Sequence, residues 1–175
     1  MIRPATAREI PALRRIERAA GAAYADVGLP EVAADEPPPL VHLEAFRVAG
    51  RAWVSTDAAD RPIAYLVALV VDGRAHVEQV SVAPAHRGNG LGAALVDHLA
   101  AWARAHGHAE LSLTTFSDVP WNAPYYARLG FRELHALGPE LAAIMVAERR
   151  ALPARAPRVA MVRSVMAPVR TGRLA

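Results

Sequence analysis

Three closely spaced glycines do most to restrict how this chain can fold, because they lie between a strand pattern and a helix pattern. They are Gly88, Gly90 and Gly92. Before them, apolar and polar residues alternate over 77–82, and Pro84 ends the alternation, as is typical of a strand. After them, apolar residues recur at helical spacing from 91 to 102, and Gly107 marks the stop. The stretch 76–102 therefore predicts a strand, a glycine loop and a helix in immediate succession.

This unit has the properties of an anion-binding turn. Glycines let the backbone turn tightly and let a ligand approach without a clash against Cβ. The first amides of a helix lack partners within the helix and lie at the positive end of its dipole, so a phosphate can accept several N–H bonds there. A tight turn that binds nothing is the alternative. Three glycines preceded by Arg87 favour the phosphate ligand.

Two common phosphate-binding motifs do not fit. A P-loop needs a lysine, and the chain contains none. Residues 88–93 satisfy the dinucleotide pattern G-x-G-x-x-A, and Glu110 follows at about the expected distance of ~20 residues. However, residues 83–87 separate the strand from the first glycine, and Glu110 precedes the next apolar strand instead of following it. A dinucleotide-binding turn is therefore rejected.

Two motifs resemble those of a known family. Residues 82–92 read V-x-P-x-x-R-G-x-G-L-G, which resembles motif A of the GNAT acetyltransferase superfamily. Residues 121–131 read W-N-A-P-Y-Y-A-R-L-G-F, which resembles the family's downstream signature of an asparagine, a tyrosine and L-G-F. Both motifs in the family's order are more specific than either alone, and the resemblance covers roughly residues 1–165.

The resemblance implies an α/β fold, with a central mixed sheet of six or seven strands and helices on both faces, in one domain over residues 1–165. It also implies acetyl-CoA as the co-substrate. Its pantetheine would lie beside Val80 and Val82 on the strand, and Asn122 would hold the loop against the cofactor. The residues expected to bind its pyrophosphate are Arg87, Gly88, Asn89, Gly90, Leu91 and Gly92.

The resemblance also assigns catalytic residues. Glu78, which the alternation places on one strand face with Val80 and Val82, would act through water as the general base. A polar residue on a sheet face is an equal alternative. Tyr126 would donate a proton to the thiolate of CoA, unless it is a core aromatic. For Asn122, capping the next helix is the favoured alternative. The strand 111–116 contains no carboxylate, which adds weight to Glu78.

Periodicity and turn signals predict the other elements. Thr6 and Glu9 form a capping box that opens a helix ending near Gly21. Residues 25–39 read as a loop, and 166–175 as a flexible basic tail. Further helices are predicted at 40–48, 91–106, near 124 and at 139–150, and strands at 1–5, 51–56, 62–71, 74–82, 110–116, 131–137 and 158–165. The strand 110–116 should run parallel to its predecessor, because a helix joins them.

Composition and charge exclude several classes. The absence of cysteine excludes disulfides and thiolate chemistry, and no histidine set has metal-ligand spacing, so no metal is expected. No apolar run reaches the ~18 residues of a membrane span, and no signal-peptide pattern is present, so a cytoplasmic protein without a membrane partner is expected. Residues 147–175 hold seven arginines and one acid, whereas 1–146 hold 13 arginines and 16 acids. A basic end of this kind, with few aromatics, does not indicate a nucleic-acid partner.

These observations predict an acetyl-CoA-dependent N-acetyltransferase that acts by direct attack in a ternary complex. The acceptor would be a primary amine on a small cationic molecule or a peptide, because five acids lie between Asp26 and Glu44 with no arginine among them. Transfer of a longer acyl group and a catalytically silent acetyl-CoA-binding module are the alternatives. Whether the protein forms a homodimer stays open.

Overall fold

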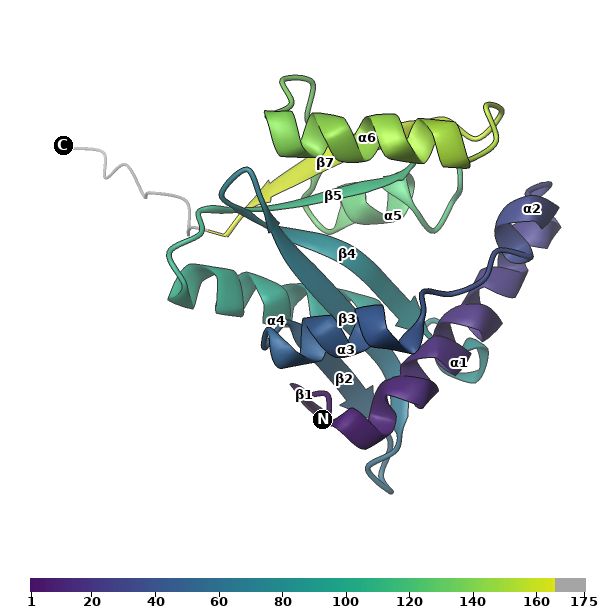
Figure 1. Cartoon of the computed structure of the whole chain (residues 1–175), viewed down its shortest axis with the longest axis vertical. Helices are drawn as coiled ribbons and strands as arrows, with labels where there is room; N and C mark the ends of the chain where they lie inside the picture. Colours follow the sequence, from purple (N-terminus) through teal and green to yellow (C-terminus); the bar gives the residue numbers. More distant parts are fainter. Residues whose placement is uncertain (166–175) are drawn as a thin grey trace, which may run out of the picture.

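The computed structural model describes residues 1–165 and contains a mixed sheet with the strand order β1-β2-β3-β4-β5-β7-β6 (Figure 1). The strands are β1 (Ile2–Pro4), β2 (Ala52–Thr56), β3 (Pro62–Val71), β4 (Arg74–Val82), β5 (Glu110–Phe116), β6 (Arg132–Glu133) and β7 (Arg158–Ser164). Neighbours from β1 to β4 are antiparallel, β4 and β5 are parallel, and β7 is antiparallel to both β5 and β6. The predicted α/β class, the strand number and the parallel pair are confirmed.

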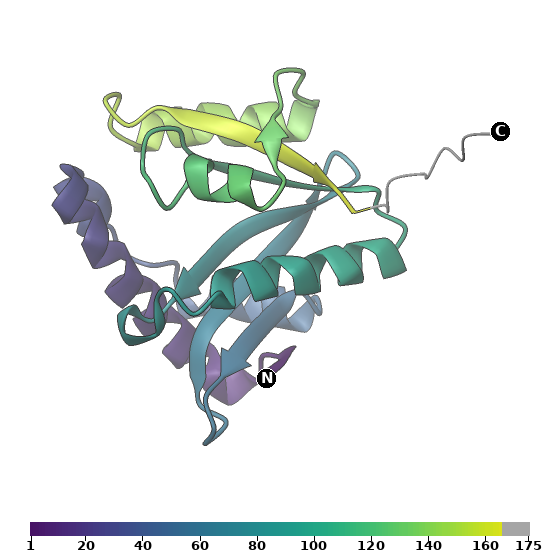
Figure 2. The same cartoon turned by 180° about the vertical axis from the view of Figure 1, so that it is seen from behind.

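Helices cover both faces of the sheet, as predicted. The α-helices are α1 (Ile10–Gly21), α2 (Pro30–Ala33), α3 (Leu40–Val48), α4 (Leu91–Ala105), α5 (Ala123–Arg128) and α6 (Pro139–Ala151), and the 3₁₀ helices are η1 (Ala7–Glu9), η2 (Ala22–Val27) and η3 (Pro84–His86). Helices α1, α3 and α6 lie on the face toward the viewer in Figure 1, and α4 and α5 on the face seen in Figure 2. The largest apolar cluster joins α4 and α5 to the sheet, and a second one joins α1 and α3 to its other face.

The N-terminal helix begins as the sequence predicts. The amide of Thr6 donates to the carboxylate of Glu9 over 2.8 Å, which satisfies an amide at the helix start. Arg3 on β1 pairs with the same carboxylate at 2.7 Å and so fastens the helix start to the sheet edge. Leu13 and Ile16 then bury one stripe of α1 against β3.

Two predicted segments are only partly right. The segment 25–39 is a loop over 35–39, but η2 ends before Gly28, whose positive φ of 76° stops the helix, and α2 follows. Leu29, between them, is buried against Phe116, and this tertiary contact orders the segment. The strand expected at 131–137 is reduced to two residues at the sheet edge. Its apolar remainder packs against α6 instead of continuing along β7.

A β-bulge in β4 corrects the predicted strand face. On β3, the consecutive residues Val67 and Ala68 pair with Gln79 and Val77, so Glu78 is the extra residue in β4. The bulge puts Val80 and Val82 on the α4 face together with Val77. Glu78 instead interacts electrostatically with residues of α1, α6 and β7. The predicted face shared by Glu78, Val80 and Val82 is therefore wrong, because strict alternation does not allow for an inserted residue.

The bulge also marks the point where β4 leaves its parallel neighbour. Residues 75–77 of β4 pair with 111–113 of β5, and no pairing follows beyond the bulge within the part of the chain that the structure describes. The two strands diverge from there (Figure 1). Residues 79–82 still pair with β3 through their other edge, so one edge of β4 is left open to a ligand.

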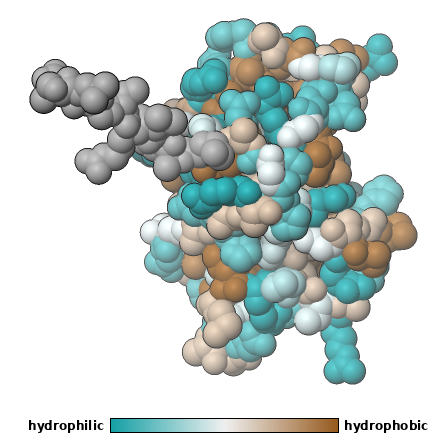
Figure 3. Space-filling view, turned by 90° about the vertical axis from the view of Figure 1, so that its left-hand side faces the viewer, coloured by the Kyte–Doolittle hydropathy of each residue, from teal (hydrophilic) through white to brown (hydrophobic). Residues whose placement is uncertain are grey.

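Polar residues dominate much of the surface. On the side seen in Figure 3, hydrophobic residues are scattered among hydrophilic ones. Among residues 1–165, no helix combines the length and the apolar character that crossing a bilayer requires. The predicted tail at 166–175 lies outside the described residues.

His76, at the paired end of β4, is a buried histidine with one polar partner. Its side chain is 1% exposed, and its Nδ1 lies 3.0 Å from the hydroxyl oxygen of Ser112 on β5. Burial, with a smaller contribution from the charge of Arg158, lowers the pKa of His76 to about 4. Protonating this ring in the folded state is therefore unfavourable.

We expect His76 to make the fold sensitive to acid. Between pH 6.5 and about 4 the unfolded chain binds a proton that the folded chain does not, so the free energy of unfolding rises with pH across this window. Lowering the pH from 6.5 to 4 should remove roughly 3 kcal/mol through this residue. Urea unfolding at several pH values measures the slope, which His76→Gln should flatten. The control His42→Gln, at an exposed position on α3, should keep the wild-type slope, and an unchanged slope in His76→Gln would contradict the assignment.

Candidate active site

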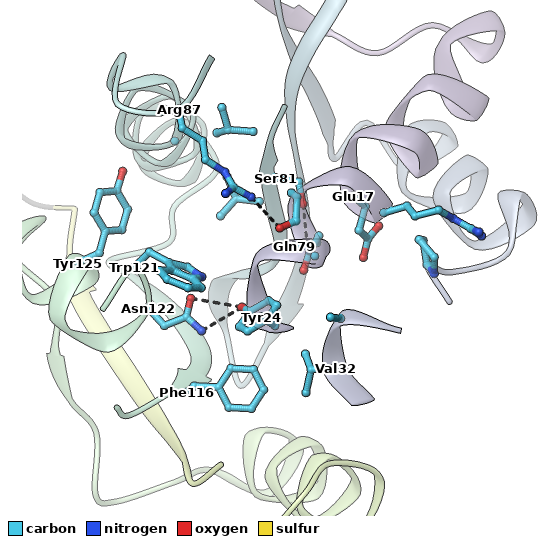
Figure 4. Close-up of a pocket in the computed structure, with 18 of the residues that line it drawn as sticks. Glu17, Tyr24, Val32, Gln79, Ser81, Arg87, Phe116, Trp121, Asn122 and Tyr125 are labelled. Carbon is cyan, nitrogen blue, oxygen red and sulfur yellow. Dashed lines mark hydrogen bonds between the residues drawn. The ribbon is translucent and has the colours of Figure 1, made fainter. Parts of the chain in front are cut away.

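A cavity of about 690 Å³ opens where β4 and β5 diverge (Figure 4). Its volume lies within the usual range for small-molecule sites. It is lined by residues of α1, η2, α2, β4, the glycine loop, the start of α4, β5 and α5, among them Glu17, Tyr24, Gln79, Val80, Ser81, Val82, Arg87, Gly88, Gly90, Leu91, Gly92, Phe116, Trp121, Asn122, Tyr125, Tyr126 and Arg158. The glycine loop and the downstream motif, which are separate in sequence, thus face one space.

The loop has the backbone that its glycines were expected to provide. Gly88 and Gly90 have φ values of 80° and 71°, a region that residues with a Cβ avoid, and Gly90 is the N-cap of α4. No protein atom would lie within 4 Å of a Cβ at either position, so this side of the loop is open. The first amides of α4 have no helical partner and border the cavity. These features fit a bound pyrophosphate.

Arg87 and Asn89 differ in how they relate to the cavity. Arg87 lines it and donates to the carbonyl of Ala20 over 2.8 Å, which ties the loop to the end of α1. Asn89 is exposed and is not among the lining residues. Of the predicted loop residues, the structure therefore brings all but Asn89 to the cavity wall.

Val80 and Val82 reach the site through the free edge of β4. Both residues line the cavity and pair with β3 on their other edge. Backbone amides and carbonyls on an unpaired strand edge can bind an extended ligand in the manner of a neighbouring strand. This geometry suits the amides of a pantetheine arm.

Tyr126 contributes a phenol to the cavity wall. Its side chain is 8% exposed, and no hydrogen bond within residues 1–165 engages its hydroxyl. Burial raises the pKa of Tyr126, and the neighbouring Tyr24 and Tyr125 add to the increase. The phenol therefore keeps its proton and can donate it to an atom in the cavity. The ring also packs against Phe131, so the core role and the site role coexist.

Tyr125 is a site residue that the sequence did not single out. Its hydroxyl lies beside the first turn of α4, near Gly92 and Ala93. A Cβ at Gly92 would lie 3.2 Å from this oxygen, so the third glycine leaves room for Tyr125. The repeated tyrosine was visible in the motif, but nothing in its spacing indicated which ring reaches the loop.

Asn122 does not cap α5 with its side chain, contrary to the favoured alternative. It is the N-cap residue, but its side chain makes no capping hydrogen bond. Its amide nitrogen donates to the hydroxyl of Tyr24 over 3.0 Å. Tyr24 also contacts the rings of Phe116 and Trp121, so this bond joins η2 to the α5 motif across the cavity.

Glu78, the predicted base, is not among the cavity-lining residues. Its side chain is exposed, yet the surrounding protein partly desolvates the carboxylate and raises its pKa. Glu148 adds to this increase, and Arg158 opposes it. A carboxylate with a raised pKa suits a general base, but this one lies outside the cavity wall and reaches the cavity only through an intervening water.

Other carboxylates line the cavity, and one of them, Glu17, was not singled out by sequence reasoning. They are Glu17 on α1 and Asp35 and Glu36 after α2. Burial raises the pKa of Glu17, and the hydroxyl of Tyr65 donates a hydrogen bond to it. The only sequence signal at Glu17 was its place at the end of an apolar helix stripe, which is equally typical of a structural residue.

The acidic segment presents less free charge than the sequence suggested. Arg14 and Arg18 on α1 both pair with Glu36. Glu31 pairs with Arg155, and Glu44 pairs with Arg47. Three of the five acids between 26 and 44 are therefore compensated by arginines. The expectation that the whole segment acts as an acidic rim is not supported.

The described part of the chain, residues 1–165, contains no group of three or more histidine, aspartate or glutamate side chains arranged to hold a metal. The site is thus built from glycine-loop amides, a strand edge, phenols and carboxylates.

Comparisons with known proteins agree with this geometry. The model of the acetyltransferase (GNAT) family matches residues 14–131. A Mycobacterium tuberculosis protein crystallised in complex with CoA is 20% identical, with a TM-score of 0.67 over 95% of this chain and 99% of that chain. The ribosomal-protein-S18-alanine N-acetyltransferase from Escherichia coli is 20% identical, with a TM-score of 0.66 over 97% of each chain. Ard1 from Thermoplasma volcanium is 17% identical, with a TM-score of 0.70 over 95% of this chain and 98% of that chain.

At these identities the solved structures show a shared fold. The family model, in contrast, covers most of the chain, including the glycine loop and the downstream motif. The chain therefore belongs to the acetyltransferase (GNAT) family.

Proposed function

We propose that this protein is an acetyl-CoA-dependent N-acetyltransferase that acetylates a primary amine by direct attack in a ternary complex. The observation that carries the proposal is the convergence of three features on one cavity. These are the glycine loop at the start of α4, the free edge of β4 and the phenol of Tyr126. An anion cradle, an extended binding edge and a proton donor are the parts that acyl transfer from a CoA thioester requires.

Acetyl-CoA binding follows from the cavity walls. The loop residues Arg87, Gly88, Asn89, Gly90, Leu91 and Gly92 would hold the pyrophosphate, with Asn89 contributing through its backbone only. Arg87 adds a positive charge at the loop. Val80 and Val82 would bind the pantetheine amides along the edge of β4, and Asn122 would border the arm from the opposite wall. Acetyl-CoA supplies the activated thioester, and a structural neighbour crystallised in complex with CoA supports this choice of cofactor.

The chemistry then needs two proton transfers. The amine nitrogen forms a bond to the acetyl carbon, and the C–S bond breaks. Glu78 would accept the proton lost by the amine through a water, and its raised pKa brings it closer to neutral pH. Tyr126 would give its proton to the departing sulfur, and its raised pKa keeps that proton in place until the thiolate forms.

A direct test separates catalysis from binding alone. Acetyl-CoA is incubated with the protein and a panel of small amines, diamines and peptides with free N-termini, and mass spectrometry follows the product amide. Amide formation that depends on the protein supports the proposal. Tight CoA binding without any amide would favour a silent binding module, and faster transfer from a longer acyl-CoA would favour the other alternative.

Gly90→Val should weaken CoA binding by at least tenfold, or about 1.4 kcal/mol. The substituted residue must adopt a φ of 71°, and its side chain would project into the open side of the loop. Gly50→Val is the matched control, since Gly50 has a φ of 69°, equally open surroundings and no place in the cavity wall. Both variants should lose about 1–2 kcal/mol of stability from left-handed strain. Calorimetric titration with CoA measures affinity. Unchanged affinity in Gly90→Val would refute the proposal that the glycine loop binds the pyrophosphate of CoA.

Tyr126→Phe should lower kcat by roughly 10²-fold while changing KM little, because a proton donor to the leaving sulfur acts in the transition state. The phenol makes no hydrogen bond within residues 1–165, so its loss should hardly affect thermal stability or CoA affinity. Steady-state kinetics with an amine that the wild type acetylates provide the measurement. A fall in stability together with an unchanged kcat would assign Tyr126 to the core alone.

Glu78→Gln should reduce kcat/KM most at neutral pH and should be partly rescued at high pH, where the amine loses its proton without help. In the wild type, kcat/KM should rise with pH through the raised pKa of Glu78, since the carboxylate form is the base. The pH–rate profiles of both proteins test this. Parallel profiles would mean that Glu78 only shapes the bulge.

A further inference from the structure

The cavity has two chemically different ends. At one end lie Arg87 and the amides at the start of α4, which suit an anion. Figure 4 shows Glu17 on the far side of Ser81 and Gln79 from Arg87 and Tyr125. A ligand whose phosphates occupy the loop would therefore leave Glu17 to a second ligand.

Glu17 differs from Glu36, which is paired, and from Asp35, which is exposed, the two other acids that line the cavity. It forms no salt bridge among residues 1–165, whereas Glu36 is held by Arg14 and Arg18. Its carboxylate is half-buried in the cavity wall, and its one hydrogen-bonding partner is the neutral phenol of Tyr65. Burying a carboxylate without a cation is unfavourable, and a cation from a ligand would offset that cost.

A hydrogen bond from a buried phenol fixes the position of this carboxylate. The side-chain amide of Gln79 donates to the Ser81 hydroxyl over 2.8 Å, and Ser81 lies near enough to Tyr65 to influence its phenol. Tyr65 is fully buried and donates to Glu17. The phenol of Tyr65 thus donates to the carboxylate from a buried, fixed position, so the negative charge is stabilised and oriented at the cavity wall.

We infer that Glu17 binds the positively charged amino or guanidino group of the acceptor, with Tyr65 as a positioning residue. The inference rests on the proposed function, in that it treats this end of the cavity as the acceptor end. It assigns the preference for cations to the half-buried carboxylate of Glu17 instead of the segment 26–44 as a whole, most of whose acids are paired.

The groups around Glu17 determine its response to pH. Burial raises its pKa most, and the negative charges of Asp35 and Glu78 add to the increase. Arg14 and the hydrogen bond from Tyr65 oppose it. Binding of a cation should therefore strengthen as the pH rises through the raised pKa of Glu17, because only the carboxylate form attracts the cation.

A binding experiment tests the inference without any turnover. Methylguanidinium is titrated into the full-length protein in the presence of CoA and followed by NMR chemical shifts, with the neutral methylurea as the matched ligand. We expect the cation to bind at least fivefold more tightly than the neutral ligand to the wild type. Glu17→Gln should abolish this preference, and Tyr65→Phe should reduce it.

The control variant is Glu44→Gln, which makes the same change in net charge at a position outside the cavity wall. It should keep the wild-type preference for methylguanidinium. An equal loss of preference in Glu44→Gln and Glu17→Gln would show that the net charge of the protein attracts the cation, and that Glu17 is not a specific binding site. A preference that persists in Glu17→Gln would overturn the inference.

A kinetic experiment separates this inference from the proposed function. Acceptors that differ only in one positive charge are compared by kcat/KM in wild type and Glu17→Gln. If the wild type acetylates amines but Glu17→Gln keeps the same charge preference, the inference fails and the proposed function stands. If no amine is acetylated, the proposed function fails, and the methylguanidinium titration still decides whether Glu17 is a cation site.

Discussion

Strand β4 contains one residue more than β3 can pair, and this extra residue, Glu78, determines where the site forms. Up to the bulge, β4 is held on both edges, by β3 and by β5. Beyond it, only β3 pairs with the strand, because the bulge increases the local twist and β5 diverges. The free edge, the glycine loop that continues from it and the first turn of α4 then face one space. The cavity is thus a consequence of ending one strand pairing early within an otherwise continuous sheet.

Buried polar groups in the site fall into two kinds, and the difference is functional. Tyr65 is fully buried and its hydroxyl donates to the carboxylate of Glu17, so its phenol is committed to holding Glu17. Tyr126 is nearly as buried, but its hydroxyl has no partner within residues 1–165 and borders the cavity. Among residues 1–165 no buried side-chain oxygen or nitrogen lacks a partner, so the hydroxyl of Tyr126 is open to the cavity and free to bind a ligand. A tyrosine therefore supports a carboxylate at position 65, whereas at position 126 we propose that a tyrosine donates a proton.

Much of the fold could be predicted from local pattern. The strands β3, β4 and β5 and the helix α3 begin and end at the predicted residues, because each combines a clear periodicity with turn or proline signals. The glycine loop could be predicted equally well, since the positive φ values at Gly88 and Gly90 before α4 favour glycine. The errors occurred where tertiary contacts override local preference. Leu29 orders a segment that reads as loop, and the apolar residues after β6 leave the sheet for α6.

The sequence by itself determined the family, the cofactor-loop geometry and the residues of the two motifs, because those depend on backbone conformations that only particular residue types tolerate. The tertiary structure decided what each polar side chain faces. An inserted residue cannot be seen in an alternating pattern, so the face of Glu78 was predicted wrongly. Glu17 and Tyr65 are 48 residues apart in sequence, and Tyr24 and Asn122 are 98 apart. Pairings at such distances follow from strand order and helix packing, and neither periodicity nor motif spacing contains that information.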